Sequence, residues 1–124
     1  MNWSKQENRA GFSPRVSARY DRSELRALID QATYDSNDES DEFAGLLGMI
    51  REEVAFPLRA RIQGEEVECT HFEWPKKGYQ LNAVCRTQKG KTRVVDIGLL
   101  EWTDLLPEGH KWIEAYLAWR EQMS

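Results

Sequence analysis

Apolar positions in the first third of the chain recur with the spacing of an α-helix. Four of them share one stripe at positions i, i+3, i+4 and i+7, namely Leu25, Leu28, Ile29 and Ala32. Asp21 precedes this stripe and Glu24 follows it three residues later, which is the spacing of a capping box. The pattern predicts a first helix from about Arg22 to Thr33.

A second apolar stripe follows and ends before a proline. It consists of Phe43, Leu46, Leu47, Ile50 and Val54. Pro57 stops this second helix, because proline lacks the amide hydrogen that a helix interior needs. Gly45 and Gly48 lie off the stripe. Each glycine costs about 1 kcal/mol relative to alanine, which indicates a close approach of the backbone to the first helix.

After Pro57 the pattern changes to period two, which is typical of strands. Apolar and polar residues alternate in four segments, at residues 58–63, 67–71, 79–85 and 92–99. The breaks between them contain turn residues, at Gly64, at residues 75–78 and at residues 88–90. Four short strands with brief turns predict an antiparallel meander that forms a small, curved, SH3-like sheet.

A last helix is predicted near the end of the chain. Pro107 can occupy its first position, where a proline is tolerated. Its inward-facing residues are expected to be Trp112, Ile113, Tyr116 and Leu117. The predicted fold class is therefore α+β, with two N-terminal helices, a small curved antiparallel sheet of about four strands, and a C-terminal helix.

Composition describes one ordinary soluble domain. The chain has 124 residues, of which 40% are hydrophobic and 31% charged. No apolar run approaches the roughly 18 residues of a membrane helix, and the first residues contain no secretory signal. We therefore expect a monomeric, cytoplasmic protein without a membrane partner.

The net charge of −4 is unevenly distributed. Residues 1–22 contain five Lys and Arg against two Asp and Glu, a charge of +3, so the rest of the chain carries −7. Residues 1–20 also lack an apolar period, and we expect them to form a mobile, weakly basic extension before a single domain at residues 21–122. An acidic body disfavours nucleic-acid binding, which needs Lys and Arg to neutralise phosphates. Only the extension could support it.

The densest charge lies between the two predicted helices, in residues 35–42. Five carboxylates fall within these eight positions, namely Asp35, Asp38, Glu39, Asp41 and Glu42. Asn37 can add an amide oxygen, and no Lys or Arg follows until Arg51. Calcium takes roughly 6–8 oxygen ligands from carboxylates, amides, carbonyls and water. The segment is therefore a candidate calcium site.

Two other interpretations of residues 35–42 remain open. An acidic run is often a solvated face or a linker. The acids can also mark the N-terminus of the second helix, where each carboxylate in the first turn gains roughly 0.3–1 kcal/mol. That accounts for two or three of them, and repulsion among the remainder favours a counter-ion. The segment is not an EF-hand loop, because Ser40 and Leu46 stand where a loop beginning at Asp35 needs glycine and glutamate.

Other reactive residues give weaker signals. Cys69, His71 and Cys85 lack the paired spacing of a zinc site. We expect both cysteines to be buried free thiols and His71 to share their core face, with His110 at the surface. The chain contains no nucleotide-binding, hydrolase or metalloprotease motif, so we expect no enzyme. Core or interface packing is the expected role of the aromatic residues Trp74, Trp102, Trp112, Tyr116 and Trp119.

Four stretches of the sequence carry a resemblance to a known family. They are "LIDQATYDSNDESDEFAGLLGMIREEVAFPLRARIQGEEVEC", "GYQLNAVCR", "VVDIGLLEW" and "LPEGHKWIEAYLAWR". From about Ser23 to Arg120 the chain resembles the CcbP-type calcium-binding proteins, small acidic proteins named from cyanobacteria. The resemblance implies a compact α+β protein that binds calcium through an acidic surface without an EF-hand.

Carried onto this sequence, the resemblance implies particular ligands. They are Asp35, Asp38, Asp41 and Glu42, then Glu39, with the amide of Asn37. A second, weaker site would use Glu52 with Glu53, or Asp96 with Glu101. We therefore expect a calcium buffer or sensor. The alternative is a protein-interaction module with an SH3-like sheet, an unidentified protein partner and no metal site.

Overall fold

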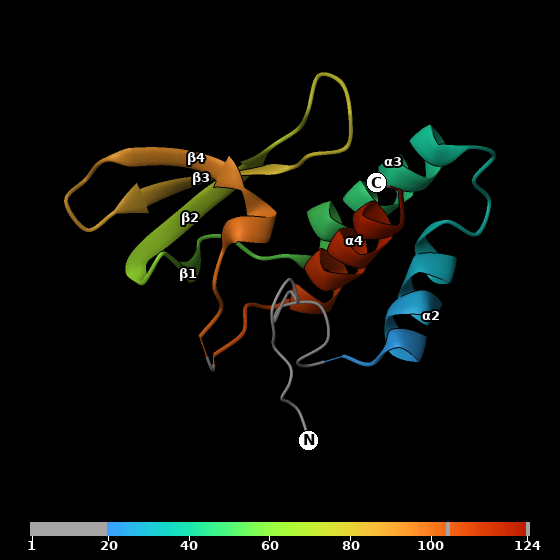
Figure 1. The fold of residues 1–124 in the computed structure, drawn as a ribbon, viewed down its shortest axis with the longest axis horizontal. Coiled ribbons are helices and arrows are strands. Elements are labelled where there is room, and N and C mark those ends of the chain that lie inside the picture. Colours follow the sequence, from blue (N-terminus) through green and yellow to red (C-terminus); the bar gives the residue numbers. More distant parts are fainter. Residues whose placement is uncertain (1–19, 104, 124) are drawn as a thin grey trace. The chain divides into compact units, whose positions relative to one another are not determined.

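The computed structural model describes residues 20–103 and 105–123 (Figure 1). Its elements are α2 (Arg22–Ala32), α3 (Glu39–Glu53), β1 (Leu58–Ile62), β2 (Glu65–Glu73), β3 (Asn82–Thr87), β4 (Thr92–Asp96), the 3₁₀ helix η1 (Ile97–Leu99) and α4 (His110–Met123). Two helices, a four-stranded antiparallel sheet and a C-terminal helix follow one another, so the predicted α+β class is confirmed. The predicted extension lies outside the described residues, apart from Tyr20.

The described chain divides into two compact units. The helical unit contains residues 20–49 and 111–123, and the sheet unit contains residues 50–110. A single domain over residues 21–122 stays a prediction. Among the described residues, no helix combines the length and the apolar character needed to cross a membrane.

Helix α2 begins with the predicted capping box. Asp21 Oδ1 accepts a hydrogen bond from the Glu24 amide at 2.8 Å, and Glu24 Oε1 accepts one from the Asp21 amide at 3.1 Å. These bonds satisfy amide groups that the first turn of a helix leaves without partners. At the other end the Thr33 hydroxyl donates to the carbonyl of Ile29 at 2.7 Å, and the helix stops at Ala32.

The two glycines of α3 differ in their surroundings. A Cβ at Gly45 would collide with the carbonyl oxygen of Ala32, so the backbones of α2 and α3 pass close together there, as predicted. A Cβ at Gly48 would meet nothing within 4 Å, so the same prediction for Gly48 is wrong. Of these two glycines, only Gly45 is required by packing.

The sheet is open and has the order β1-β2-β3-β4, with every pair antiparallel. Strand β1 alternates as predicted, with Leu58, Ala60 and Ile62 buried. A register shift between Cys69 and His71 interrupts the pairing of β2 with β3. Because a bulge inserts one extra residue, the side chains after it change face. His71 is therefore exposed while Cys69 is buried, and the prediction of a shared core face for these two residues is wrong.

Helix α4 begins at His110, three residues later than predicted. Gly109 has a φ of +81°, which is not helical, and a Cβ there would meet the backbone of Glu53. His110 is buried rather than at the surface, and the ring of Trp102 packs edge-on against its ring with centroids 4.9 Å apart. The four residues predicted to face inward are all buried, namely Trp112, Ile113, Tyr116 and Leu117.

Candidate functional site

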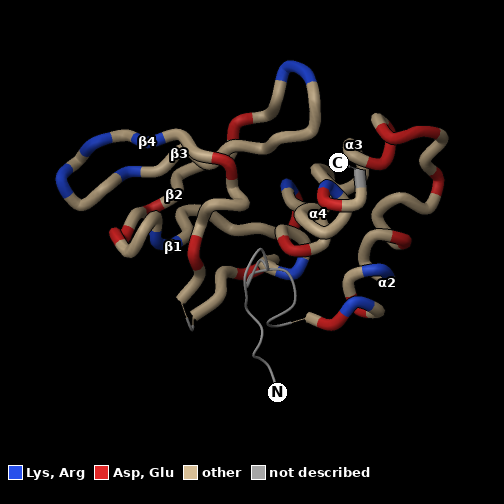
Figure 2. The backbone as a smooth tube through the Cα atoms, viewed as in Figure 1, with Lys and Arg blue, Asp and Glu red and all other residues tan. Residues whose placement is uncertain are grey.

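The acidic segment, residues 35–42, joins α2 to the first turn of α3. Figure 2 shows its acidic positions along this connection. No Lys or Arg occurs between Arg26 and Arg51 in the sequence. Four of its five carboxylates are exposed and Glu42 is half-buried. The segment is therefore a negatively charged surface of the helical unit.

Two of these carboxylates cap α3. Asp38 Oδ1 accepts a hydrogen bond from the Asp41 amide at 2.9 Å, and Asp41 Oδ2 accepts one from the Asn37 amide at 3.2 Å. The Glu42 amide donates to the carbonyl of Asp38 at 3.0 Å, which closes the first turn. Asp38 therefore acts as the N-cap, in agreement with the interpretation of this stretch as a helix start. Each of the two capping carboxylates uses one oxygen for these bonds.

Glu42 is held by a residue far away in the sequence. The indole Nε1 of Trp119, on α4, donates to Glu42 Oε1 at 2.9 Å. Trp119 is only 1% exposed, and its ring stacks on Phe43 with centroids 5.9 Å apart and planes 11° apart. A buried indole thus fixes the end of the acidic segment to the core of the helical unit. The sequence offers no local signal for this contact, because 77 positions separate its partners.

Asp35 and Glu39 differ from the other carboxylates. Both are exposed, and neither forms a hydrogen bond or an ion pair with another residue in the described part of the chain. Tyr34, beside Asp35, is 89% exposed. All four oxygens of these two carboxylates are therefore accessible to solvent ions.

The kind of donor in the acidic segment suits calcium, since carboxylate and amide oxygens are the ligands that this ion prefers. Within residues 20–103 and 105–123, however, no three His, Cys, Asp or Glu side chains gather as a group that could hold a metal ion. The donors thus fit calcium in chemistry, but a coordination sphere is not assembled around a single point. The six predicted ligands remain a prediction.

One predicted second site is engaged in other interactions. Asp96 Oδ1 accepts a hydrogen bond from the Gly98 amide at 2.9 Å and caps η1. Glu101 Oε1 accepts one from the Gly64 amide at 3.2 Å. Both carboxylates belong to the sheet unit, where they fix turns of the backbone. These hydrogen bonds account for the positions of Asp96 and Glu101 without a bound metal ion.

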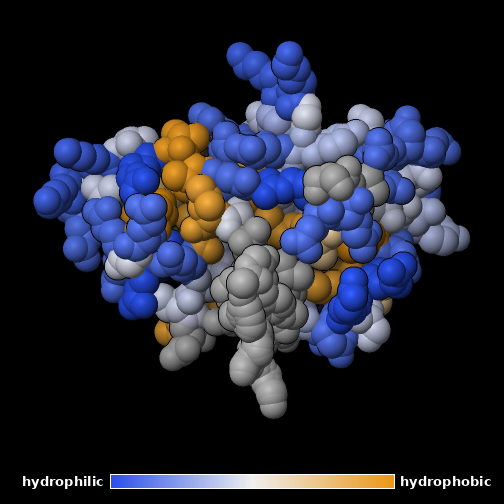
Figure 3. Space-filling view, in the orientation of Figure 1, coloured by the Kyte–Doolittle hydropathy of each residue, from blue (hydrophilic) through white to orange (hydrophobic). Residues whose placement is uncertain are grey.

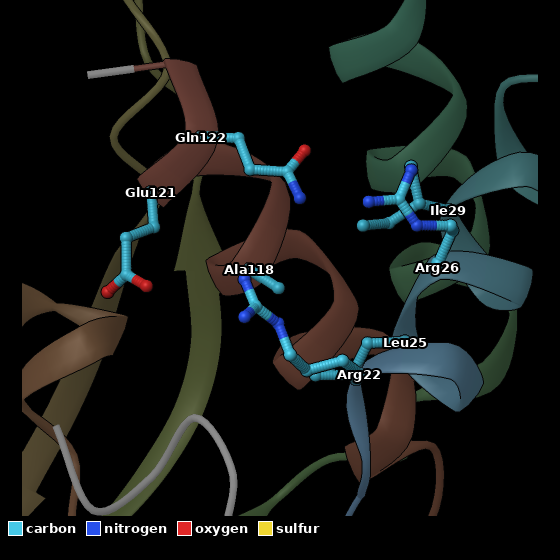
Figure 4. Close-up of a pocket in the computed structure, with 7 residues that line it drawn as sticks. All are labelled: Arg22, Leu25, Arg26, Ile29, Ala118, Glu121 and Gln122. Atoms are coloured by element: carbon cyan, nitrogen blue, oxygen red, sulfur yellow. The ribbon is translucent and has the colours of Figure 1, made fainter.

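The helical unit also contains a small pocket of about 90 Å³ that the sequence did not suggest (Figure 4). Its lining comes from α2 and α4, namely Arg22, Leu25, Arg26, Ile29, Ala118, Glu121 and Gln122. Arg22 and Arg26 are four residues apart, which places them on one face of α2. Two cationic groups make this pocket unsuitable for a metal ion.

Comparison with known proteins gives one fold relationship. No protein-family model matches this sequence, and no curated protein has a similar sequence. The structure is similar to the crystal structure of Anabaena CcbP, with a TM-score of 0.66 and 13% sequence identity. The similarity covers 84% of this chain and 94% of that one. At this identity the comparison establishes a shared fold.

Proposed function

We propose that this protein binds calcium through the acidic segment and acts as a calcium buffer or sensor. The observation that carries the proposal is the density of carboxylates in residues 35–42. The sequence contains no Lys or Arg between Arg26 and Arg51, so no positively charged residue lies close to them along the chain. The fold shared with Anabaena CcbP supports it, as does the resemblance of the sequence to CcbP-type calcium-binding proteins.

The side chains of the segment contribute to such a site in different ways. Asp35 and Glu39 can offer both of their oxygens. Asp38 and Asp41 can each offer the oxygen that does not cap α3, and Asn37 can offer its amide oxygen. Water would complete the roughly 6–8 oxygens that calcium takes. Magnesium should bind more weakly, because it demands a tighter octahedral arrangement.

Binding should stabilise the fold by relieving repulsion among the carboxylates. Two like charges 4 Å apart repel by about 4 kcal/mol at an effective dielectric constant of 20. A ligand that binds the folded state alone adds RT ln(1 + [L]/Kd), about 2.7 kcal/mol at a hundredfold excess over Kd. The thermal midpoint should therefore be higher in calcium than in EDTA.

The decisive experiment is a calcium titration of two charge-matched variants. Asp35→Asn/Glu39→Gln removes the carboxylates that the fold does not use, so it tests binding without disturbing the cap. Glu65→Gln/Glu66→Gln removes the same charge from the sheet unit. There each carboxylate lies within 4 Å of an arginine, with 3.9 Å between Arg93 and Glu65 and 3.7 Å between Arg61 and Glu66.

We expect calorimetry to show calcium binding in the wild type and the sheet variant. The segment variant should bind at least about tenfold more weakly, which corresponds to about 1.4 kcal/mol. In ¹H–¹⁵N spectra of the wild type, calcium should shift the amide signals of residues 33–43. Equal affinity in both variants would reject the site, and unshifted signals at millimolar calcium would reject calcium binding altogether.

The alternative function, a protein-interaction module, is favoured by one surface feature. β4 is an edge strand of the open sheet, and Val94 and Leu99 are 49% and 61% exposed. Figure 3 shows hydrophobic surface over the β4 and η1 region of the sheet. Docking through the tryptophan-rich C-terminal helix is disfavoured, because Trp112 and Trp119 are buried. A Val94→Lys variant that loses a protein partner, in a protein whose wild type shows no calcium binding by calorimetry, would support this alternative.

A further inference from the structure

The two cysteines of the sheet unit lie opposite one another. Cys69 on β2 and Cys85 on β3 are paired in register, and both are free thiols. Residues directly opposite in an antiparallel pair have Cα atoms about 4.5–5.5 Å apart. A disulfide accepts Cα separations of about 4.4–6.8 Å. The backbone therefore already holds the two cysteines at a distance that a disulfide can bridge.

The side chains of the two cysteines also meet. Paired residues project from the same face of a sheet, here the buried face, and Cys69 and Cys85 are 0% and 1% exposed. Side chains directly opposite one another on neighbouring antiparallel strands have Cβ atoms about 4.5–5.5 Å apart. Cys69 Sγ also lies 3.4 Å from the carbonyl oxygen of His71, to which it can donate. The sulfur atoms thus face one another across the two strands.

A positively charged side chain, that of Arg93, is next to the two cysteines in the sheet. Arg93 on β4 is the register partner of Cys85, so Cys69, Cys85 and Arg93 form a row across three neighbouring strands. The neighbouring Cys69 thiol lowers the pKa of Cys85, burial opposes this change, and the positive charge of Arg93 lowers the pKa further. The neighbouring Cys85 and burial raise the pKa of Cys69. Cys85 is therefore the sulfur that becomes a thiolate first, and the thiolate is the reactive form.

We propose that Cys69 and Cys85 form a reversible intramolecular disulfide when the protein meets a peroxide. The Cys85 thiolate attacks one oxygen of hydrogen peroxide, the O–O bond breaks, and the other oxygen leaves as hydroxide and is protonated to water. Cys85 is then a sulfenic acid. The Cys69 sulfur attacks the Cys85 sulfur, an S–S bond forms, and the sulfenic oxygen leaves as water with the proton of the Cys69 thiol. Two electrons pass from the two thiols to the peroxide, and two waters form.

The bulge next to Cys69 offers a route for the oxidant. Thr70 occupies the register shift between Cys69 and His71, and both Thr70 and His71 are exposed. A bulge leaves a residue unpaired and disrupts the ladder of hydrogen bonds. The proposed reaction requires a local opening at this point that admits hydrogen peroxide without unfolding the sheet.

The disulfide closes a loop that contains the connection between β2 and β3. Such a bond restricts the unfolded chain more than the folded one, which stabilises the fold. The oxidised protein should therefore melt several degrees higher than the reduced protein. Amide hydrogen exchange in β2 and β3 should slow as well.

The test treats the full-length native protein with a small excess of hydrogen peroxide, then blocks free thiols and measures the mass. We expect a loss of two hydrogen atoms, no free thiol, and a Cys69–Cys85 cross-link in the peptide map. Dithiothreitol should restore both thiols. Two free thiols in the oxidant-treated native protein, when the same treatment in urea oxidises them, would overturn the proposal. A cross-link between chains would overturn it as well.

Single variants separate the roles of the two sulfurs. In Cys69→Ser the sulfenic acid at Cys85 has no thiol to react with, so dimedone should label it when the peroxide-treated protein is unfolded in the presence of the reagent. In Cys85→Ser we expect much slower labelling of Cys69. Equal labelling of the two variants would reject the order of attack. If either variant fails to fold, the wild-type peptide map still decides whether the disulfide forms.

Discussion

The helical unit and the sheet unit use acidic side chains in opposite ways. The helical unit, residues 20–49 and 111–123, has ten Asp and Glu against four Lys and Arg, a net charge of −6. The sheet unit, residues 50–110, has ten against nine, a net charge of −1. Both units contain the same number of carboxylates, so the difference between them lies in the number and placement of cations.

In the sheet unit carboxylates alternate with arginines on neighbouring strands. Arg61 lies 3.7 Å from Glu66, and Arg93 lies 3.9 Å from Glu65. These side chains are about half exposed, so each ion pair contributes little stability. Their effect is to keep the local charge near zero. A cation from solvent therefore finds no net attraction there.

In the acidic segment of the helical unit, carboxylates accept hydrogen bonds from backbone amides and from an indole. The N-cap bonds of Asp38 and Asp41 and the bond from Trp119 to Glu42 fix their positions without neutralising their charge. Neutral hydrogen-bond donors thus hold the acidic segment in place and leave its negative charge uncompensated. Three variant series test this contrast and the contacts that stabilise the helical unit.

The largest effect is expected at Trp119. Trp119→Ala removes a buried ring and leaves Glu42 without its donor, which should cost about 3–5 kcal/mol of unfolding free energy. In the sheet unit Trp74 is 40% exposed, with the Arg51 guanidinium 4.6 Å from its ring centroid. Trp74→Ala should cost about 1 kcal/mol. Urea denaturation measures both.

Trp119→Phe separates the contribution of the hydrogen bond from that of the buried ring. It keeps an aromatic ring against Phe43 but removes the N–H donor, so the hydrogen bond should contribute about 1 kcal/mol of the total. If Trp119→Ala costs no more than Trp74→Ala, the acidic segment is not anchored by α4 and the contrast between the units fails.

An intermediate effect is expected at the glycines of α3. Gly45→Ala places a Cβ against the backbone carbonyl of Ala32, which cannot move aside cheaply, so it should destabilise by roughly 1–3 kcal/mol. Gly48→Ala meets open space and should stabilise by up to about 1 kcal/mol, because alanine is the better helix former. Thermal melts of the two variants should shift in opposite directions. A thermal midpoint that does not fall in Gly45→Ala would mean that α2 and α3 are not in close contact.

The smallest effect is expected at Asp21 and depends on pH. Hydrogen bonds from the Glu24 amide and then from Ser23 hold the pKa of the Asp21 carboxyl below its ordinary value of 3.8. A lowered pKa in the folded state contributes stability above the ordinary value, and this contribution is lost as the pH falls through the lowered one. Asp21→Ala should therefore be less stable than the wild type at pH 7, and the difference should shrink in acid.

Asp21→Ser serves as the control for this titration. Serine keeps an oxygen that can accept from the Glu24 amide but carries no ionisable group. It should retain most of the cap at pH 7. A difference between wild type and Asp21→Ala that stays constant from pH 7 to strong acid would show that the charge of the cap contributes nothing.

Local interactions are the part of this protein that its sequence determined. The capping box of α2, the two apolar stripes, the period-two strands and the crowding of acids in residues 35–42 all follow from neighbours a few positions apart. Backbone hydrogen bonding and side-chain periodicity act over that range, so their patterns are readable in the chain. The fold class could therefore be predicted, and so could the acidic segment as a surface.

The tertiary structure decided what depends on residues distant in sequence. It joined Glu42 to Trp119, turned His71 outward through a bulge, and set Cys69 opposite Cys85 beside Arg93. Each of these depends on register and packing, in which a shift of one residue changes the face of every side chain that follows. Pairwise contacts of this kind have no local pattern, and only the folded backbone selects among them.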